Sequence, residues 1–423
     1  TMAIFPASAI PSGASDFTID QSLRFNFGDS SYLNYTPSSA GSRRIFTLSA
    51  WCKLGARIGV SDGQFTFLNA GDGNQTNSGN SEIQIRNDKV VIYHDGGSPS
   101  NHESTALLRD PSAWYHIVVA VDTNQATESN RCKTYVNGEL QTYTGTIAED
   151  LDFDFNNTNF HSIGRNDEGG GPKYGDGYMA EYHWIDGTAY DADDFGETGD
   201  YGEWKPKKVS GLTYGTNGFY LDFADSSALG NDVSGNNNDW AVNNITATDQ
   251  MLDSPTNNFC TLNILHHDSD HTAIPNATYS EGNLKTSTNT TAGASSNFFG
   301  TMGVTSGKWY WEAIRTGGNV AGASGFSDYD GLDQRTYYGG NGYAYTRLSS
   351  ASYGASWTTG DIIGIAFDAD TQALTFYKNG STQGTISSAL GSGKTYFPMG
   401  WDGSGSLYSI FVTNFGQDSS FAG

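Results

Sequence analysis

Short runs in which apolar and polar residues alternate fill most of this chain, and two segments share one layout. In residues 114–141, an apolar run that ends in Asp is followed by a polar break and by a second run closed by Asn137-Gly138. Residues 361–384 repeat this layout and close with Asn379-Gly380. Asn-Gly between such runs favours a β-hairpin, because a type I′ turn needs positive φ at both central residues. The sequence therefore predicts a hairpin at each Asn-Gly pair.

The same alternation predicts strands along the rest of the chain, with Gly, Asp and Ser between them. These strands cover residues 23–27, 32–35, 46–52, 65–69, 82–86, 89–94, 114–121, 132–136, 159–164, 178–185, 219–223, 298–304, 308–315, 343–346, 361–368, 373–378 and 407–415. One short helix is predicted near residues 191–196. The pattern predicts an all-β protein of two tandem β-sandwiches. We expect an extended N-terminal arm at 1–21, a first sandwich at 22–212, an Asn/Asp-rich connector at 213–279 and a second sandwich at 280–423.

Composition agrees with this fold class and narrows the partners. The 423 residues include 53 Gly, 13% aromatic residues and only 16% charged residues, a balance suited to short strands joined by tight turns. The net charge of −24 argues against nucleic acid as a partner, because binding to phosphates depends on Lys and Arg. No apolar stretch approaches the about 18–20 residues of a membrane span, so we expect no membrane insertion. The first residues lack the basic region of a secretory signal, so we expect no secretory route.

Three cysteines, Cys52, Cys132 and Cys260, are widely spaced and odd in number. This spacing fits neither a disulfide framework nor a zinc site. We therefore expect each of them to be a small buried residue.

The order of motifs along the chain adds a family resemblance. Residues 22–197 resemble a laminin-G-like, concanavalin-A-like jelly roll through Leu23-Arg24-Phe25, Phe46-Thr47-Leu48-Ser49-Ala50-Trp51, Trp114-Tyr115-His116-Ile117-Val118-Val119, Lys133-Thr134-Tyr135-Val136-Asn137-Gly138 and Gly177-Tyr178-Met179-Ala180-Glu181. Residues 280–415 resemble a SPRY-type sandwich through Gly307-Lys308-Trp309-Tyr310-Trp311-Glu312, Gly360-Asp361-Ile362-Ile363-Gly364, Leu374-Thr375-Phe376-Tyr377-Lys378-Asn379-Gly380 and Tyr396-Phe397-Pro398.

The tandem arrangement is similar to a family of virion proteins from marine tailed bacteriophages. The matching segments are Ile10-Pro11-Ser12-Gly13, Ile19-Asp20-Gln21-Ser22-Leu23-Arg24-Phe25, Arg109-Asp110-Pro111-Ser112-Ala113-Trp114-Tyr115, Pro255-Thr256-Asn257-Asn258-Phe259-Cys260 and Asn414-Phe415-Gly416-Gln417. The resemblance implies a structural or adhesive part of a phage particle. Because both folds also occur in unrelated proteins, the fold alone does not assign a function.

Candidate metal ligands lie in the predicted connector. Asp232, Ser234, Asn236 and Asn238 place side-chain oxygens at alternate positions, and calcium takes about six to eight oxygen ligands. Asx turns, in which these side chains bond to the backbone, are the alternative. A second set of carboxylates lies in loops of the first sandwich: Asp72, Asp167, Glu168 and Asp176. These are either a jelly-roll calcium site or solvated surface groups. His266, His267 and His271 have no orienting carboxylate at a fixed spacing, which favours solvated loop histidines.

No catalytic motif is evident. Jelly-roll glycosidases need two carboxylates about 5 to 9.5 Å apart, typically on one strand as Glu-x-Asp-x-x-Glu. Glu181 and Asp186 are the nearest approach to this motif and have a different spacing. Neither a Gly-x-Ser-x-Gly elbow nor a phosphate-binding loop is present. We therefore expect a non-enzymatic protein.

Aromatic residues of the second sandwich lie largely in Gly/Asp/Ser-rich segments that the pattern assigns to loops. They are Tyr329, Tyr337, Tyr338, Tyr343, Tyr345, Trp357 and Trp401. Aromatic faces beside amides and carboxylates suit sugar rings, because they stack on C–H faces while polar groups bind hydroxyls. Packing in the core or between subunits is the alternative.

These observations lead to one functional hypothesis. We expect a non-enzymatic surface protein of a phage virion, in a tail fibre, spike or capsid decoration, assembled in the host cytoplasm and acting outside it. Its partners would be other virion proteins, a host surface glycan bound weakly and multivalently, and copies of itself, with residues 1–20 covering an edge strand of a neighbour. The alternative is a secreted protein that binds or degrades polysaccharide.

Overall fold

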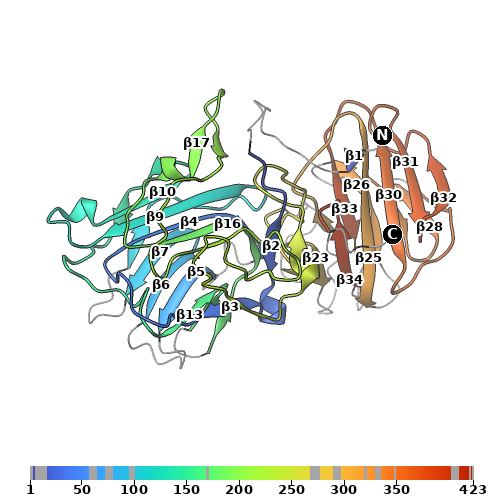
Figure 1. Ribbon diagram of the computed structural model, residues 1–423. Helices are drawn as coiled ribbons and strands as arrows, with labels where there is room; N and C mark the ends of the chain where they lie inside the picture. Colours follow the sequence, from blue (N-terminus) through green and yellow to red (C-terminus); the bar gives the residue numbers. More distant parts are fainter. Residues whose placement is uncertain are drawn as a thin grey trace. The chain divides into compact units, whose positions relative to one another are not determined.

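The computed structural model describes residues 3–4, 17–56, 64–71, 80–94, 101–167, 171–266, 277–288, 297–318, 322–328, 335–346, 349–401, 409–418 and 421. Strands dominate it, and the described helices are four short 3-10 turns, at Phe27–Asp29, Glu128–Asn130, Ala192–Asp194 and Ala247–Asp249. No described helix is long and apolar enough to cross a membrane. The chain divides into two compact units, residues 8–258 and residues 259–423 together with residues 1–7 (Figure 1). The all-β prediction is confirmed.

The first unit is a sandwich of two antiparallel sheets (Figure 1). The first sheet runs in the order β11 (Glu139–Leu140), β10 (Cys132–Val136), β9 (Trp114–Asp122), β4 (Ile45–Leu54), β16 (Gly177–Asp186), β2 (Ser22–Phe25) and β21 (Gln250–Met251), and β19 (Phe219–Leu221) also pairs with β16. The second runs in the order β12 (Tyr143–Thr144), β8 (His102–Ser104), β7 (Lys89–His94), β6 (Ser81–Arg86), β5 (Gln64–Gly71), β13 (Phe160–Ile163), β3 (Tyr32–Tyr35) and β20 (Ala241–Asn243). Two small hairpins, β14 (Arg165–Asn166) with β15 (Lys173–Tyr174) and β17 (Gly196–Thr198) with β18 (Trp204–Pro206), complete the unit.

Aromatic rings fill the core between these sheets. Phe46 stacks on Trp184 with ring centroids 5.1 Å apart, and its edge meets Phe153 and Phe155, each at 5.3 Å. Cys52 and Cys132 are buried in this unit and Cys260 in the other, and none of these described cysteines forms a disulfide. The prediction of buried cysteines is confirmed.

The segment predicted as a connector, residues 213–279, belongs largely to the first sandwich. It supplies β19 and β21 to one sheet and β20 to the other, and the first unit ends at Asn258. β19 lies within the strand predicted at 219–223. The Asn/Asp-rich composition hid β20 and β21, because each has only two or three residues and little alternation.

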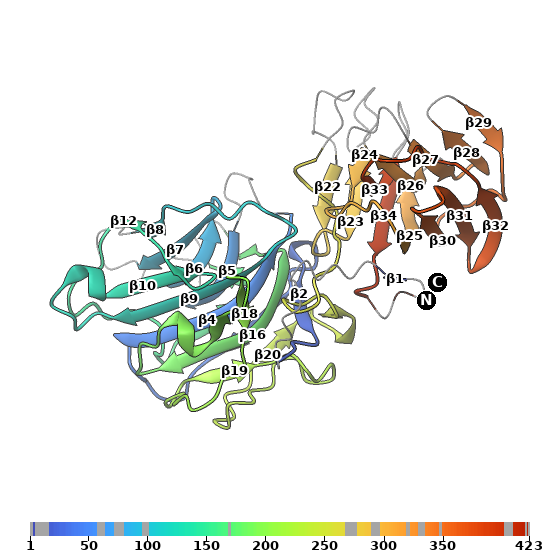
Figure 2. The same ribbon diagram turned by 90° about the horizontal axis from the view of Figure 1, so that it is seen from above.

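The second unit is also a two-layered sandwich, as Figure 2 shows. One sheet runs in the order β22 (Ala277–Ser280), β23 (Lys285–Thr288), β34 (Ser409–Asn414), β25 (Lys308–Gly318), β30 (Ile362–Asp368), β31 (Ala373–Lys378) and β32 (Ser381–Ile386). The other runs in the order β24 (Asn297–Phe299), β33 (Tyr396–Trp401), β26 (Ala323–Asp328), β27 (Arg335–Gly339), β28 (Tyr343–Thr346) and β29 (Ser350–Ser352). Phe326 meets Phe367 across the layers, with centroids 4.8 Å apart.

Both predicted hairpins are confirmed. Asn137 and Gly138 have φ of 50° and 79° between β10 and β11, and Asn379 and Gly380 have φ of 49° and 76° between β31 and β32. Positive φ at both central positions is the requirement that Asn and Gly meet at low cost.

The N-terminal arm pairs within its own chain. β1 (Ala3–Ile4) runs parallel to β25 beside Trp309 and Tyr310, beyond the point where β34 stops pairing at Glu312. The predicted contact of residues 1–20 with a neighbouring subunit stays a prediction. At the end of the arm, the Ile19 N–H donates to Thr256 Oγ1 at 2.9 Å, which fastens this residue to the first unit.

Candidate functional site

The sheet β24-β33-β26-β27-β28-β29 of the second unit has an outer face that carries aromatic rings. Consecutive residues of a strand point to opposite sides of a sheet. In β27, Tyr338 therefore points into the core, where it is fully buried and its centroid lies 5.6 Å from that of Phe376. Tyr337 points to the other side, where it packs with Phe299 and Met399.

On this side, four rings form what we call the aromatic face: Tyr337, Tyr343, Tyr345 and Trp401. Tyr337 stacks on Tyr345 with centroids 5.2 Å apart and planes 18° apart. Trp401 lies 5.9 Å from Tyr337, and Tyr343 lies 6.4 Å from Tyr345. Tyr343 is 42% exposed and Tyr337 8% exposed, with Tyr345 and Trp401 between them. The rings thus pass from a buried end to a solvent-exposed end.

Small residues on the central strand allow this arrangement. β26 runs between the strand of Trp401 and the strand of Tyr337, with Ala323 opposite Trp401 and Gly325 opposite Tyr337. Residues that face each other across strands point to the same side. Because Ala323 and Gly325 project almost nothing there, Trp401 and Tyr337 approach each other across β26.

Polar groups border the aromatic face. Asn341 Nδ2 donates to the Tyr345 hydroxyl at 2.6 Å, and Asn341 Oδ1 accepts from the Tyr343 N–H at 3.2 Å. Burial raises the pKa of Tyr337, while the nearby positive charge of Arg335 opposes that rise. Rings with amide and hydroxyl groups at their margin match the amphipathic surface of a sugar.

The remaining predicted aromatic residues lie elsewhere. Tyr338 donates its hydroxyl to the Ala355 carbonyl, and Trp357 is 2% exposed beneath the Arg315 guanidinium, so both are core residues rather than ligand contacts. Tyr329 lies outside the described residues. The assignment to loops is wrong for Tyr337, Tyr338 and Trp401, which are strand residues. Tyr343 and Tyr345 lie in β28, where the sequence predicts a strand at 343–346.

The predicted calcium ligands of the first unit are engaged with the backbone. Asp232 Oδ1 accepts from the N–H groups of Tyr220 at 2.9 Å and Ser234 at 2.8 Å, and its Oδ2 accepts from the Asn238 N–H at 2.9 Å. The carboxamide of Asn236 donates to two backbone carbonyls. This is the network of Asx turns that the sequence allows as the alternative. Calcium binding stays a prediction, and this geometry adds no observation in its favour.

The two described carboxylates of the second set, Asp167 and Asp176, are also bound by protein groups. Asp167 accepts from Arg165 at 2.6 Å, and Asp176 accepts from the Ala56 N–H at 3.1 Å. Asp72 and Glu168, as well as His267 and His271, lie outside the described residues. His266 stacks on Phe299, with centroids 4.2 Å apart, so it is not a solvated loop residue. Within the described ranges, no three His, Cys, Asp or Glu residues are placed to hold a metal ion.

A buried polar cluster on the first sheet escaped the sequence patterns. Glu181 sits in β16 where the register with β4 shifts, and its φ of 48° is unusual for a non-glycine residue. Burial raises the pKa of its carboxyl to about 7, although Tyr220 donates a hydrogen bond of 2.6 Å. His183 Nε2 lies 3.9 Å from Glu181 Oε2. The Glu-Tyr-His string itself carries no signal for this strain or burial.

A serine and a histidine lie beside this cluster. Ser49 Oγ is 2.9 Å from His116 Nε2, and Trp204 Nε1 donates to His116 Nδ1 at 3.0 Å. Burial lowers the pKa of His116 to about 3, so the ring is neutral and carries one proton. Because an indole only donates, that proton is on Nε2 and points to Ser49. A Ser–His nucleophile requires the opposite tautomer.

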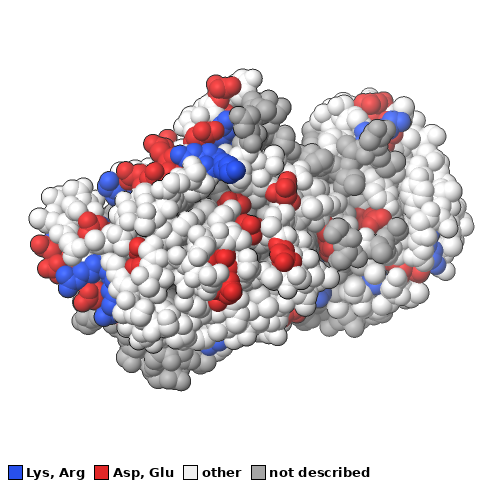
Figure 3. Space-filling view, in the orientation of Figure 1, with Lys and Arg blue, Asp and Glu red and all other residues white. Residues whose placement is uncertain are grey.

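The surface charge of the described residues is mixed. On the face drawn in Figure 3, Lys and Arg form small groups next to Asp and Glu rather than a broad basic area. For example, Lys205 pairs with Glu197 at 3.2 Å.

Each of the two units is similar to a known domain family. The concanavalin A-like lectin/glucanases superfamily matches residues 27–193, and the SPRY domain matches residues 305–417. The crystal structure of the SPRY domain of human HERC1 is 17% identical over 33% of this chain and 90% of that chain, with a TM-score of 0.26. Another human SPRY domain is 18% identical over 31% and 92% of the two chains, with a TM-score of 0.27. A native heptameric SAP-like pentraxin from Limulus polyphemus is 14% identical over 41% and 79%, with a TM-score of 0.31. No curated protein sequence matches. The chain therefore carries a concanavalin-A-like domain and a SPRY domain in tandem.

Proposed function

We propose that this protein is a non-enzymatic glycan-binding protein of a bacteriophage virion surface, in a tail fibre, a spike or a capsid decoration. The aromatic face is the observation that carries glycan binding. It combines stacked, partly exposed rings with the Asn341 carboxamide at its margin. The virion setting rests on the order of motifs shared with virion proteins of marine tailed phages. Concanavalin-A-like and SPRY domains are compatible with carbohydrate binding.

Binding at the aromatic face would be weak at each site. A sugar would lay its C–H face on Tyr343 and Tyr345, and Asn341 lies within reach of its hydroxyls. Each aromatic contact contributes about 0.5–1.5 kcal/mol beyond its buried area. Repetition of the protein on a particle would convert this weak binding into avidity.

A glycan array tests the binding. We expect the Y343A/Y345A/W401A protein to lose most of the signal, since three contacts amount to roughly a hundredfold in affinity. The control is Tyr201→Ala, because Tyr201 is 71% exposed but belongs to the first unit. Equal binding by the triple variant and the Tyr201 variant would contradict the role of the aromatic face. Tyr338 is left unchanged because it is a core residue.

Antibody labelling of particles tests the virion setting. Phage particles from the source, negatively stained and labelled with antibody to this chain, should carry the label at a fixed position. Label that remains with cell debris and is absent from purified particles would remove the virion part of the proposal while leaving glycan binding untouched.

The alternative, a polysaccharide-degrading enzyme, is favoured by one observation. Glu181 has the raised pKa of a general acid and a strained backbone. Against this, Trp51, Phe195 and Pro206 close around it and leave little free space. Reducing ends released from algal or bacterial polysaccharides, and lost in the Glu181→Gln variant, would establish the enzyme instead.

A further inference from the structure

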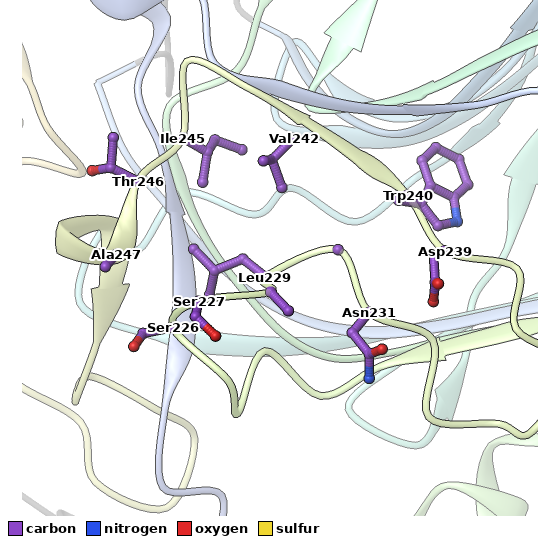
Figure 4. A pocket seen from close by; sticks show the side chains of 12 residues that line it. Ser226, Ser227, Leu229, Asn231, Asp239, Trp240, Val242, Ile245, Thr246 and Ala247 are labelled. Atoms are coloured by element: carbon purple, nitrogen blue, oxygen red, sulfur yellow. The ribbon is translucent and has the colours of Figure 1, made fainter.

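A hollow of about 340 Å³ lies in the first unit, in the segment predicted as a connector (Figure 4). Residues 226–231 form one side and residues 239–247 the other. Figure 4 shows Val242 and Ile245 facing Leu229 across it, with Trp240 and Asp239 at one end. This volume lies within the range of small-ligand sites, about 300–1,000 Å³.

The walls of this hollow are held in place by the surrounding structure. The backbone N–H of Trp240 donates to the Gly230 carbonyl at 2.8 Å, and this bond joins the two sides. The Trp240 ring packs against Phe219 at 4.9 Å and Tyr35 at 5.6 Å. At the other end, the Thr246 N–H donates to Asp249, whose carboxylate pairs with the buried Arg24 at 3.0 Å. A preformed site loses little free energy to ordering when a ligand binds.

The lining combines an apolar surface with polar groups, of which only Asp239 is charged. Leu229, Trp240 and Ile245 are largely buried and supply the apolar part. The polar part consists of the hydroxyls of Ser226, Ser227 and Thr246, the carboxamide of Asn231 and the carboxylate of Asp239. Hydroxyl and carboxamide groups both donate and accept, as the hydroxyls of a sugar do.

The charges around the hollow disfavour one class of ligand. Asp239 is exposed, and one of its oxygens already accepts from the Asp232 N–H at 2.9 Å. Together with the net charge of −24, this carboxylate disfavours anionic ligands. No Lys or Arg lines the hollow to receive a phosphate or a uronic acid.

We propose that this hollow binds one neutral sugar residue, such as the terminal residue of a glycan. Its size admits a single ring rather than an extended chain. The site belongs to the first unit, whereas the aromatic face belongs to the second, so neither depends on the other. The chain would then have two different glycan sites. The hollow would take a terminal sugar residue, and the aromatic face would stack on the C–H face of a sugar.

Two valines of equal exposure provide the test. Val242 lines the hollow and is 44% exposed, and Val233 lies outside it and is 42% exposed. The probes are the methyl glycosides of glucose, galactose, mannose and N-acetylglucosamine, measured by saturation-transfer NMR and titration. We expect the full chain to bind at least one of them with a Kd on the order of 1 mM. Val242→Trp should weaken this binding at least about tenfold, and Val233→Trp should leave it unchanged.

Further variants keep the test decisive. Ala247→Trp fills the hollow from another position and replaces Val242→Trp if that variant does not fold. The proposal is overturned if none of the four glycosides binds, if both valine variants lose binding equally, or if only glucuronic acid or glucosamine binds. Loss of monosaccharide binding in Y343A/Y345A/W401A would also overturn it, because the sugar would then occupy the aromatic face. Loss of array binding in that variant, with monosaccharide binding intact, supports both sites.

Discussion

At the scale of single residues, burial fixes the protonation of the polar cluster beside Glu181. Burial raises the pKa of Glu181 to about 7 and lowers the pKa values of His116 and His183 to about 3. The neutral carboxyl therefore stabilises the fold fully below its ordinary pKa of 4.5, and this contribution is lost as the pH rises through about 7. The neutral histidines act oppositely: their contribution is full above 6.5 and is lost as the pH falls toward about 3.

The Glu181→Gln variant isolates the carboxyl from the histidines. Its amide has no charge to lose and its oxygen still accepts from Tyr220, so we expect it to be more stable than the wild type at pH 8 by up to about 3 kcal/mol. At pH 5 the two proteins should differ little. Urea unfolding at both pH values measures this, with the exposed Glu139→Gln as the control. The same pH dependence in wild type and Glu181→Gln would show that Glu181 is already ionised in the fold.

At the scale of elements, the Asn of each Asn-Gly turn also forms two hydrogen bonds with the neighbouring strand. The Asn137 N–H donates to the His116 carbonyl at 2.9 Å, and its side-chain oxygen accepts from the His116 N–H at 2.8 Å. Asn379 makes the same two contacts with Ile362, at 2.8 and 2.9 Å. The shared sequence layout therefore reflects a three-strand motif rather than a hairpin alone.

Two substitutions of Asn137 measure how much this residue contributes to stability. Asn137→Ala loses both the tolerance of positive φ, about 1–2 kcal/mol, and a hydrogen bond of about 1 kcal/mol. We expect it to lower the free energy of unfolding by roughly 2–3 kcal/mol. Asn137→Asp keeps the acceptor oxygen and accommodates positive φ, so it should lose much less. Chemical denaturation of both variants checks this, and equal losses would show that neither the side-chain bond nor the tolerance of positive φ stabilises the turn.

The strands differ in how clearly the sequence predicts them. Strands such as β9 and β30 bury large apolar residues and are evident from the chain. β26 reads Ala-Ser-Gly-Phe-Ser-Asp, and it resembles a loop because its outward positions are small to admit the rings of neighbouring strands. Once β26 and β27 are assigned to loops, the alternation that separates Tyr337 from Tyr338 is lost. The sequence predicts that the candidate site is aromatic. It does not predict which of these rings point to the aromatic face and which point into the core, because that depends on the register of the strands.

At the scale of the whole molecule, a buried ion pair ties the segment that ends the first unit to the core of that unit. Lys53 of β4 and Asp253 are both fully buried and 2.8 Å apart. Trp114 Nε1 donates to the same carboxylate at 2.9 Å, and Lys53 also donates to Asn258 at 2.8 Å. Asp253 and Asn258 both lie beyond residue 212, the boundary that the sequence predicts for the first sandwich. A lysine buried without its partner costs about 3–5 kcal/mol, a large part of the about 5–15 kcal/mol that stabilises a domain.

Two shortened chains test this boundary. We expect residues 17–258 to unfold in one cooperative transition, because they contain both sheets with all their edge strands. Residues 17–212 lack β19, β20, β21 and Asp253, and they should be unfolded or much less stable by circular dichroism and thermal unfolding. Lys53→Met in the shorter chain should recover part of the lost stability, since it removes the unpaired charge from the core. Equal melting temperatures for the two chains would show instead that residues 213–258 are an accessory segment and that Lys53 finds another partner without them.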